Sequence, residues 1–380
     1  MCAAPAGVAS GALLEYSVVF TDRALNHMSA AFQEVMRDIS GTLRGVYGAE
    51  RAVVVPGSGT FGMEAVARQF ATDRRCLVLR NGWFSYRWTQ IFEACRIPAS
   101  ETVLSARAVA DTPEAPFRPA PIDEVVATIR AERPDVVFAA HVETASGMLL
   151  PDDYLRSLGE AAREAGALLV LDCIASGALW VDMRALGIDV LISAPQKGWS
   201  GPACAALVML GPRAAERLGA TRSTSFACDL ARWNEIMTAY EQGGHAYHAT
   251  MPTDALRAFR DTMRETIELG LDTARERQLE LGSRVRASLE HRGFPSVAAG
   301  GFQAPGVIVS YTTDPEIRSG RALAALGLQI AAGVPLRCGE PEDFSTFRIG
   351  LFGLDKLRDV DAAVGRLDEA FDTLARRGAA

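Results

Sequence analysis

The stretch from Val136 to Asp172 constrains the fold more than any other part of the sequence. It reads as an apolar strand over Val136–His141, an amphipathic helix over Tyr154–Ala165 followed by Gly166, and a second apolar strand over Leu168–Asp172. Glycine directly after a helix adopts the left-handed conformation that ends it. A strand, a helix and a strand in this order form a parallel pair with a right-handed crossover. We therefore predict an α/β fold with a mainly parallel sheet wrapped by helices.

Similar apolar runs lie on both sides of this unit. The further strands that we expect are Ala52–Val55, Cys76–Leu79, Val190–Ser193 and Ala205–Met209. Near Thr253 the pattern changes to a long charged helical segment, expected over Asp254–Arg292. A smaller unit follows, with strands over Gly306–Tyr311 and Phe347–Gly350 and helices over Glu316–Leu326 and Leu354–Arg377.

The length of the chain favours more than one packed unit, because 380 residues exceed one typical hydrophobic core. We predict a flexible N-terminus over residues 1–14 and a large domain over residues 15–255. A connecting helix and a small C-terminal α/β domain are expected over residues 256–380.

Charge and cysteine content narrow the possible functions. The net charge is −7 without a cluster of Lys or Arg, so the sequence lacks the pattern of proteins that bind nucleic acid or an anionic membrane. No apolar run reaches the roughly 18 to 20 residues of a membrane span, and residues 1–13 lack the basic region of a secretory signal. We expect a cytoplasmic protein that acts on small molecules. The seven cysteines have no metal-ligand spacing, which predicts reduced thiols and no metal.

Two segments favour the binding of anions. Pro56–Thr60 is a glycine-rich turn between a strand and a helix, where backbone N–H groups and the helix dipole can bind a phosphate. A plain turn is the alternative. Arg348 lies in the apolar segment Thr346–Gly350, where a guanidinium is costly unless it meets an anion. It would clamp a substrate carboxylate or form a structural pair with an Asp or Glu.

Asp172 and Lys197 are candidates for one site at the edge of the sheet. Asp172 ends an apolar strand, and a buried carboxylate there needs a cationic partner such as the protonated ring nitrogen of pyridoxal phosphate. A helix cap or a salt bridge is the alternative. Lys197 lies one crossover later, in a loop of small residues between two strands. Desolvation there would lower its pKa and make it a nucleophile, whereas a solvated turn lysine would be inert.

In their order, these segments resemble the class V, fold-type I aminotransferases that depend on pyridoxal phosphate, especially the alanine- and serine-glyoxylate aminotransferases. The resemblance covers most of the chain. It rests on the motifs His27-Met-Ser, Gly57-Ser-Gly-Thr with Glu64-Ala65, Asn81-Gly82, His141-Val-Glu143-Thr-Ala-Ser-Gly147, Asp172-Cys-Ile-Ala-Ser176, Ser193-Ala-Pro-Gln196-Lys197, Tyr247-His248-Ala-Thr250-Met-Pro252 and Phe347-Arg348-Ile-Gly350.

The resemblance implies a role for each matching residue. Lys197 would carry pyridoxal phosphate as a Schiff base, and Asp172 would meet its ring nitrogen. Phe84, with Trp83 beside it, would stack on the cofactor, and Arg348 would anchor the substrate carboxylate. The other implied cofactor-binding residues are Ser58, Gly59, Thr60 and Gln196 at the phosphate, Thr144 against the cofactor, and Tyr247 and Thr250, which would reach across a homodimer interface to the neighbouring subunit's phosphate.

The implied reaction moves an amino group from a small amino acid such as alanine or serine to a 2-oxo acid such as glyoxylate or pyruvate. A lyase or a cysteine desulfurase, with Cys338 as sulfur carrier, is an alternative on the same scaffold. Desulfurases, however, carry His where this chain has Gln196. A 2-aminoethylphosphonate:pyruvate aminotransferase is a further alternative, because that family shares the His-x-Glu-Thr segment. The intact Lys197 and Asp172 disfavour a regulatory protein that keeps the cofactor without turnover.

Two departures from the family pattern bear on the substrate. Relatives usually open with a Gly-Pro-rich segment that lines the substrate pocket, whereas this chain has Glu15–Asn26 there. Pro195 stands where relatives have a small residue, which changes the backbone donors near the phosphate and leaves the contact of Ser193 open. The residues therefore define the cofactor site better than they define the amino acid substrate.

Overall fold

The structure is a computed structural model that describes residues 13–378. The flexible N-terminus expected over residues 1–14 therefore falls, except for its last two residues, outside the described residues. None of the helices between residues 13 and 378 is long and apolar enough to cross a membrane.

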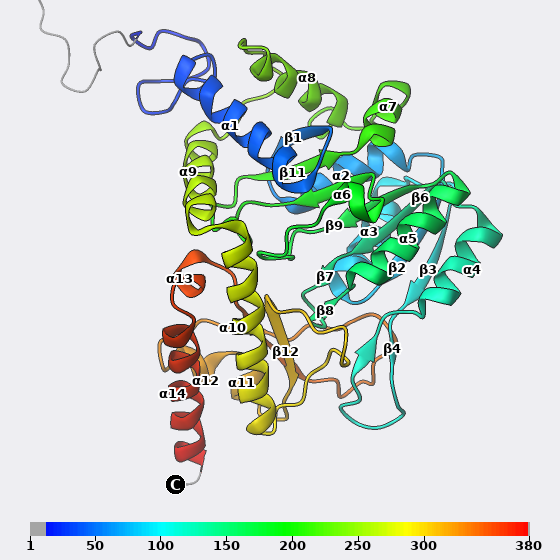
Figure 1. Ribbon diagram of the computed structural model, residues 1–380, viewed down its shortest axis with the longest axis vertical. Coiled ribbons are helices and arrows are strands. Elements are labelled where there is room, and N and C mark those ends of the chain that lie inside the picture. Colours follow the sequence, from blue (N-terminus) through cyan, green and yellow to red (C-terminus); the bar gives the residue numbers. More distant parts are fainter. Residues whose placement is uncertain (1–12, 379–380) are drawn as a thin grey trace, which may run out of the picture.

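A seven-stranded sheet forms the centre of the larger part of the molecule (Figure 1). Its middle strand, β9, is parallel to β6 on one side and to β10 on the other. Strands β2 and β3 extend the parallel part, whereas β11 and β1 form the opposite, antiparallel edge. The predicted α/β fold with a mainly parallel sheet is confirmed. In spatial order the strands are β1 (Arg51–Pro56), β11 (Ala205–Leu210), β10 (Val190–Ser193), β9 (Leu168–Asp172), β6 (Val136–Ala140), β2 (Arg75–Arg80) and β3 (Ser100–Ser105).

The predicted crossover unit is present. Helix α5 (Asp152–Ala165) connects β6 to β9 and ends at Gly166, whose φ is 78°. Strand β6 stops at Ala140, one residue before the predicted end. Strand β3 was not predicted, because it lies at the edge of the sheet and is not fully buried at any position.

Helices cover this sheet, and β6, β9, β10 and β11 are buried along their whole length, as expected for strands covered on both faces. Helix α2 packs against β10 and β11, α3 against β2 and β6, and α1 and α8 against β1. The remaining elements of this part are α1 (Ala30–Tyr47), α2 (Gly59–Phe70), α3 (Trp83–Cys95), α4 (Ile122–Glu132), α6 (Met183–Leu186), α7 (Pro212–Ala220) and α8 (Leu230–Glu241), with the short strands β4 (Arg107–Ala108), β5 (Phe117–Arg118), β7 (Val142–Glu143) and β8 (Met148–Leu149).

The helical segment predicted over Asp254–Arg292 is present, but it consists of two helices rather than one. The structure has α9 (Thr253–Leu269) and α10 (Leu271–His291), separated at Gly270 with φ 92° and ψ 127°. Residues other than glycine rarely adopt such a positive φ. The helical spacing of apolar residues continues across this break, so the pattern alone did not reveal it.

A second, antiparallel sheet in the order β12–β14–β13 lies beside α10 and α14, which run side by side in Figure 1. Two helices predicted here are each split in two, one of them at Gly320. The domain boundaries drawn at residues 255 and 256 stay a prediction. The elements of this part are β12 (Val307–Tyr311), α11 (Pro315–Arg318), α12 (Arg321–Ala324), β13 (Ala331–Ala332), β14 (Thr346–Gly350), α13 (Leu354–Leu357) and α14 (Val360–Gly378).

A small apolar cluster joins the two sheets. It contains Val142 and Ala145 from the segment after β6, and Val307 and Val309 from β12. Trp83, Phe84, Cys338 and Phe352 pack against this cluster. Phe84, predicted to stack on the cofactor, therefore lies where the two parts of the chain meet.

Candidate active site

Asp172 lies at the carboxyl end of the central strand β9, paired with Ala140 on one side and Ile192 on the other. Its side chain is buried, and Oδ1 accepts the N–H of Ile174 at 2.9 Å. Burial raises the pKa of Asp172 to about 7, against the hydrogen bond from Ile174 and the attraction of Lys197. A carboxyl group in this state would be stabilised by a cation placed against it.

Lys197 follows β10 and reaches the same edge as Asp172. Burial lowers the pKa of Lys197, the charge of Asp172 opposes this shift, and the charge of Arg348 adds to it. The Nζ atom lies 4.9 Å from the centroid of the Phe352 ring. Among residues 13–378, Lys197 has no ion-pair partner within 4.0 Å. The amine is thus available for chemistry, as a nucleophile would be.

A cavity of about 390 Å³ opens beside Lys197. The exposed Gln196 lines it together with residues of α9 and of the segment around Phe352. The only other lysine of the chain, Lys356, donates to the carbonyl oxygen of Phe352 at 2.8 Å and pairs with Asp355. The two lysines of the sequence therefore differ sharply in their surroundings.

The glycine-rich turn lies close to Asp172. Helix α2 begins at Gly59, and Ser58 before it is extended and forms no side-chain cap. A Cβ atom on Gly59 would come within 2.5 Å of Ile174, two residues after Asp172. A larger residue at position 59 would therefore require the Ile174 side chain to move. The Thr60 hydroxyl accepts a hydrogen bond from Nη1 of Arg87 at 3.0 Å.

Phe84 lies in the first turn of α3, which the buried Glu143 holds in place. Glu143 Oε1 accepts the N–H of Phe84 at 3.2 Å, and Oε2 accepts the N–H of Ser85 at 2.8 Å. The guanidinium carbon of Arg87 lies 5.1 Å from the centroid of the Phe84 ring, and that of Arg348 lies 5.8 Å from the same centroid. An aromatic face is thus presented between two cationic side chains.

Arg348 lies on β14 and points toward the segment after β6. Its Nε donates to the carbonyl oxygen of Ala332 at 2.8 Å, and its Nη1 donates to that of Thr144 at 3.5 Å. Burial lowers the pKa of Arg348, and the charge of Glu143 opposes this shift. No carboxylate lies within 4.0 Å of Arg348 in the described part of the chain. This arrangement favours the carboxylate clamp over a structural ion pair.

Ser193 and Pro195 are both buried before the loop that carries Lys197. Ser193 is the last residue of β10, and the carbonyl oxygen of Pro195 accepts the N–H of Gly201 at 2.9 Å. This hydrogen bond shapes the loop that carries Lys197.

Tyr247 and Thr250 lie apart from the other predicted site residues. They are in the segment between α8 and α9, and their hydroxyl groups are 3.1 Å apart. The Tyr247 ring is 55% exposed and lies 5.6 Å from the ring of His27. Neither residue forms a hydrogen bond with Lys197, Asp172 or Thr60 in the described chain. A role at the cofactor would require them to act on another subunit.

Cys338 is enclosed rather than reactive. Its Sγ lies 3.4 Å from the carbonyl oxygen of Arg80. Burial raises the pKa of Cys338 to about 12, and the charges of Glu143 and Glu340 add to this shift. A thiol that stays protonated is a poor nucleophile, which disfavours the sulfur-carrier alternative.

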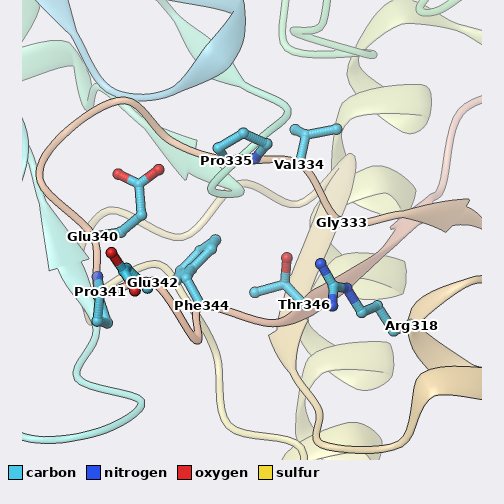
Figure 2. Close-up of a pocket in the computed structure, with 9 residues that line it drawn as sticks. All are labelled: Arg318, Gly333, Val334, Pro335, Glu340, Pro341, Glu342, Phe344 and Thr346. Carbon is cyan, nitrogen blue, oxygen red and sulfur yellow. The ribbon is translucent and has the colours of Figure 1, made fainter.

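A second cavity, of about 320 Å³, lies between β13 and the start of β14 (Figure 2). Arg318 and Thr346 lie together at one end of the view, and Glu340 and Glu342 lie at the other. None of the residues that the sequence predicts for the active site lines this cavity, so we treat it as separate from the candidate active site.

Three residues of the site were missed or given no role by the sequence analysis. Arg87 could have been found, because it follows Phe84 by three positions and so shares its helix face. Glu143 belongs to the motif His141–Gly147, but its partners Phe84 and Ser85 are far away in the sequence. Phe352 carries no local signal, since only the tertiary fold brings it under Lys197. The described residues contain no group of three or more His, Cys, Asp or Glu that could hold a metal.

The chain is similar to known aminotransferases over most of its length. The family model described as aminotransferase class-V matches residues 9–309. The 2-aminoethylphosphonate–pyruvate transaminase of Paraburkholderia phymatum is 30% identical over 354 residues, 91% of this chain and 89% of that protein. The L-aspartate–glyoxylate aminotransferase of Paracoccus denitrificans is 26% identical over 274 residues, 71% of this chain and 66% of that protein. The crystal structure of a subgroup IV aspartate aminotransferase from Thermus thermophilus has a TM-score of 0.75 at 25% identity, covering 92% of this chain and 93% of that one.

These matches extend over most of the chain and include the segments that carry Asp172 and Lys197. Their fold is that of the fold-type I enzymes that use pyridoxal phosphate. The chain is therefore a pyridoxal-phosphate-dependent aminotransferase, and it belongs to the class V aminotransferase family.

Proposed function

We propose that this enzyme moves an amino group from a small amino acid, such as alanine or serine, to a 2-oxo acid such as glyoxylate or pyruvate. The observation that carries the proposal is that Asp172, at the end of β9, and Arg348, on β14, both lie near enough to Lys197 for their charges to act on its amine. Lys197 and Arg348 are partly desolvated, and neither has an acidic partner within 4.0 Å in the described chain. A desolvated amine near a guanidinium that no carboxylate of the described residues neutralises suits a substrate that carries a carboxylate.

The residues fit pyridoxal phosphate in charge and in shape. Asp172 is buried and would pair with a ring nitrogen that carries a proton. The uncapped start of α2 offers the N–H groups of Gly59 and Thr60 to a phosphate. Lys197, Phe84, Ser58, Thr144 and Gln196 complete the set that we propose to hold the cofactor. When bound, pyridoxal phosphate supplies a ring that accepts electrons from the substrate Cα.

In the proposed mechanism Lys197 moves protons. Its lowered pKa increases the fraction of neutral amine, which can take the proton from the substrate Cα. Arg348 grips the substrate carboxylate and so fixes the Cα within reach of Lys197 Nζ. Asp172 stays ionised against the protonated ring nitrogen and keeps the ring poor in electrons.

We further propose a cytoplasmic homodimer with shared active sites. Support comes from the exposed Tyr247 and from the exposed apolar side chains of Leu13, Tyr16 and Val18. Co-purifying a Lys197→Ala chain with a chain that carries Tyr247→Phe and Thr250→Ala tests the sharing. If sites are shared, the mixed dimer has one intact site and regains part of the activity that each parent lacks. A mixture as inactive as its parents would refute shared sites.

A second candidate is a 2-aminoethylphosphonate:pyruvate aminotransferase. The observation that favours it is the 30% identity to the Paraburkholderia phymatum transaminase over nine-tenths of this chain. In that case Arg348 would hold the carboxylate of the oxo acid acceptor.

One experiment separates these functions. The absorbance spectrum of the loaded enzyme is recorded with alanine, serine, aspartate, cysteine or 2-aminoethylphosphonate, and a 2-oxo acid is then added. Loss of the cofactor's visible band with one donor, and its return with the oxo acid, identifies that donor. Release of ammonia or sulfide with an unchanged band would overturn transamination in favour of a lyase.

A further inference from the structure

Arg87 occupies a place in the site that no role described above accounts for. It lies on α3, one turn after Phe84, and its guanidinium carbon is 5.1 Å from the centroid of that ring. Its Nη1 donates to the Thr60 hydroxyl at 3.0 Å. No carboxylate lies within 4.0 Å of its guanidinium in residues 13–378, and the side chain is half-buried.

This placement gathers positive charge at the start of α2. The first N–H groups of α2 carry partial positive charge, and Ser58 provides no cap for them. A guanidinium that donates to Thr60, the second residue of the helix, adds a full positive charge at the same end. Two positive groups face each other, and a single anion bound between them would stabilise both.

We propose that Arg87 is the counterion of the cofactor's phosphate, and that it makes the site select phosphorylated pyridoxal over pyridoxal itself. This inference rests on the proposed cofactor site. The planar guanidinium can give two parallel hydrogen bonds to a phosphate while the N–H groups of Gly59 and Thr60 bind the other oxygens. Glu143 fixes the first turn of α3, so Arg87 is directed at α2 by a rigid helix.

The test is a titration of the cofactor-free protein with pyridoxal phosphate and, separately, with pyridoxal, followed by absorbance. We expect Arg87→Gln to weaken the binding of pyridoxal phosphate by roughly tenfold to a hundredfold, the loss typical of one charge-assisted contact. The affinity for pyridoxal, which has no phosphate, should stay within about threefold. Arg87→Lys keeps the charge without the paired donors and should fall between wild type and Arg87→Gln.

Arg80→Gln is a matched control. Arg80 donates to a threonine hydroxyl, that of Thr89, at 3.0 Å, and lies 4.8 Å from an aromatic centroid, that of Tyr86. Arg80→Gln therefore removes the same two kinds of contact as Arg87→Gln, but it removes no contact at the start of α2. This control should bind both ligands as wild type does.

Three outcomes would overturn the inference. Equal weakening of both ligands by Arg87→Gln would indicate a structural role, and unchanged binding of both would indicate none. Unchanged cofactor affinity with a raised KM for a substrate that has a second acidic group would assign Arg87 to the substrate instead. If wild-type protein binds neither ligand, the proposed cofactor site fails as well, which separates the two failures.

Discussion

The carboxylate of Glu143 holds the helix turn that carries Phe84, although the two residues are 59 positions apart. Glu143 is fully buried and accepts the N–H groups of Phe84, Ser85 and Ala145, together with the Ser85 hydroxyl. One acidic side chain thus ties the ring predicted to stack on the cofactor to the segment that carries Thr144. The geometry of the ring depends on a residue with no expected chemical role.

Glu143→Gln should destabilise the protein and loosen the Phe84 ring. An amide offers one acceptor oxygen where the carboxylate offers two, and its NH2 group would face backbone donors. We expect the free energy of unfolding to fall by about 2–3 kcal/mol, measured by urea unfolding. Glu164→Gln removes an exposed pair with Arg130 and should cost less than about 1 kcal/mol. Equal losses in the two variants would contradict a special role for Glu143.

Lys197→Ala should abolish covalent attachment of the cofactor and lower turnover by at least roughly 10²–10⁴-fold, the range of general acid–base catalysis. Mass spectrometry after borohydride reduction measures the attachment, and a coupled oxo acid assay measures the turnover. Lys356→Ala is the control and should keep both. Full turnover by Lys197→Ala would refute the catalytic assignment.

The raised pKa of Asp172 predicts that the stability of the cofactor-free protein depends on pH. Because burial raises its pKa from 3.8 to about 7, the folded protein holds a proton that the unfolded chain releases at lower pH. Stability from this group is therefore full below about pH 4 and is lost as the pH rises toward 7. Relative to Asp172→Asn, the wild type should lose up to about 4 kcal/mol over this range. Unfolding curves at several pH values measure the difference, and a constant difference would exclude the effect.

Arg348→Gln should act on substrate rather than on cofactor. Loss of a bidentate contact with a carboxylate should lower kcat/KM by roughly 10- to 100-fold, mostly through KM, with unchanged cofactor affinity. Arg318→Gln, an exposed arginine that lines the separate cavity of Figure 2, is the control and should leave the kinetics unchanged. An Arg348→Gln variant with wild-type KM for amino acids would remove its assigned role.

The sequence predicts the parallel strands well, because β9 and β10 are buried throughout and therefore consist of unbroken apolar runs. It does not predict β3, whose exposed edge position removes that signal. The break at Gly270 is also hidden, since glycine inside a helical pattern is compatible with either a continuous or a broken helix.

Within the site, the positions of Asp172 and Lys197 could be predicted because Asp172 ends β9 and Lys197 follows β10, two neighbouring parallel strands. The contact between Arg87 and Thr60 depends on how α3 packs beside α2, which spacing alone does not encode. Within residues 13–378, Tyr247 and Thr250 form no hydrogen bond with the other candidate site residues, so a single sequence gives their position but not their function.

The scarcity of lysine has a practical consequence for studying the enzyme. Reactive aldehydes usually modify many surface amines, which obscures how much cofactor occupies the functional position. The sequence contains two lysines. The side-chain amine of Lys356 is bound to the carbonyl oxygen of Phe352 and to the carboxylate of Asp355. Occupancy can therefore be counted directly as label per chain, with little background to subtract.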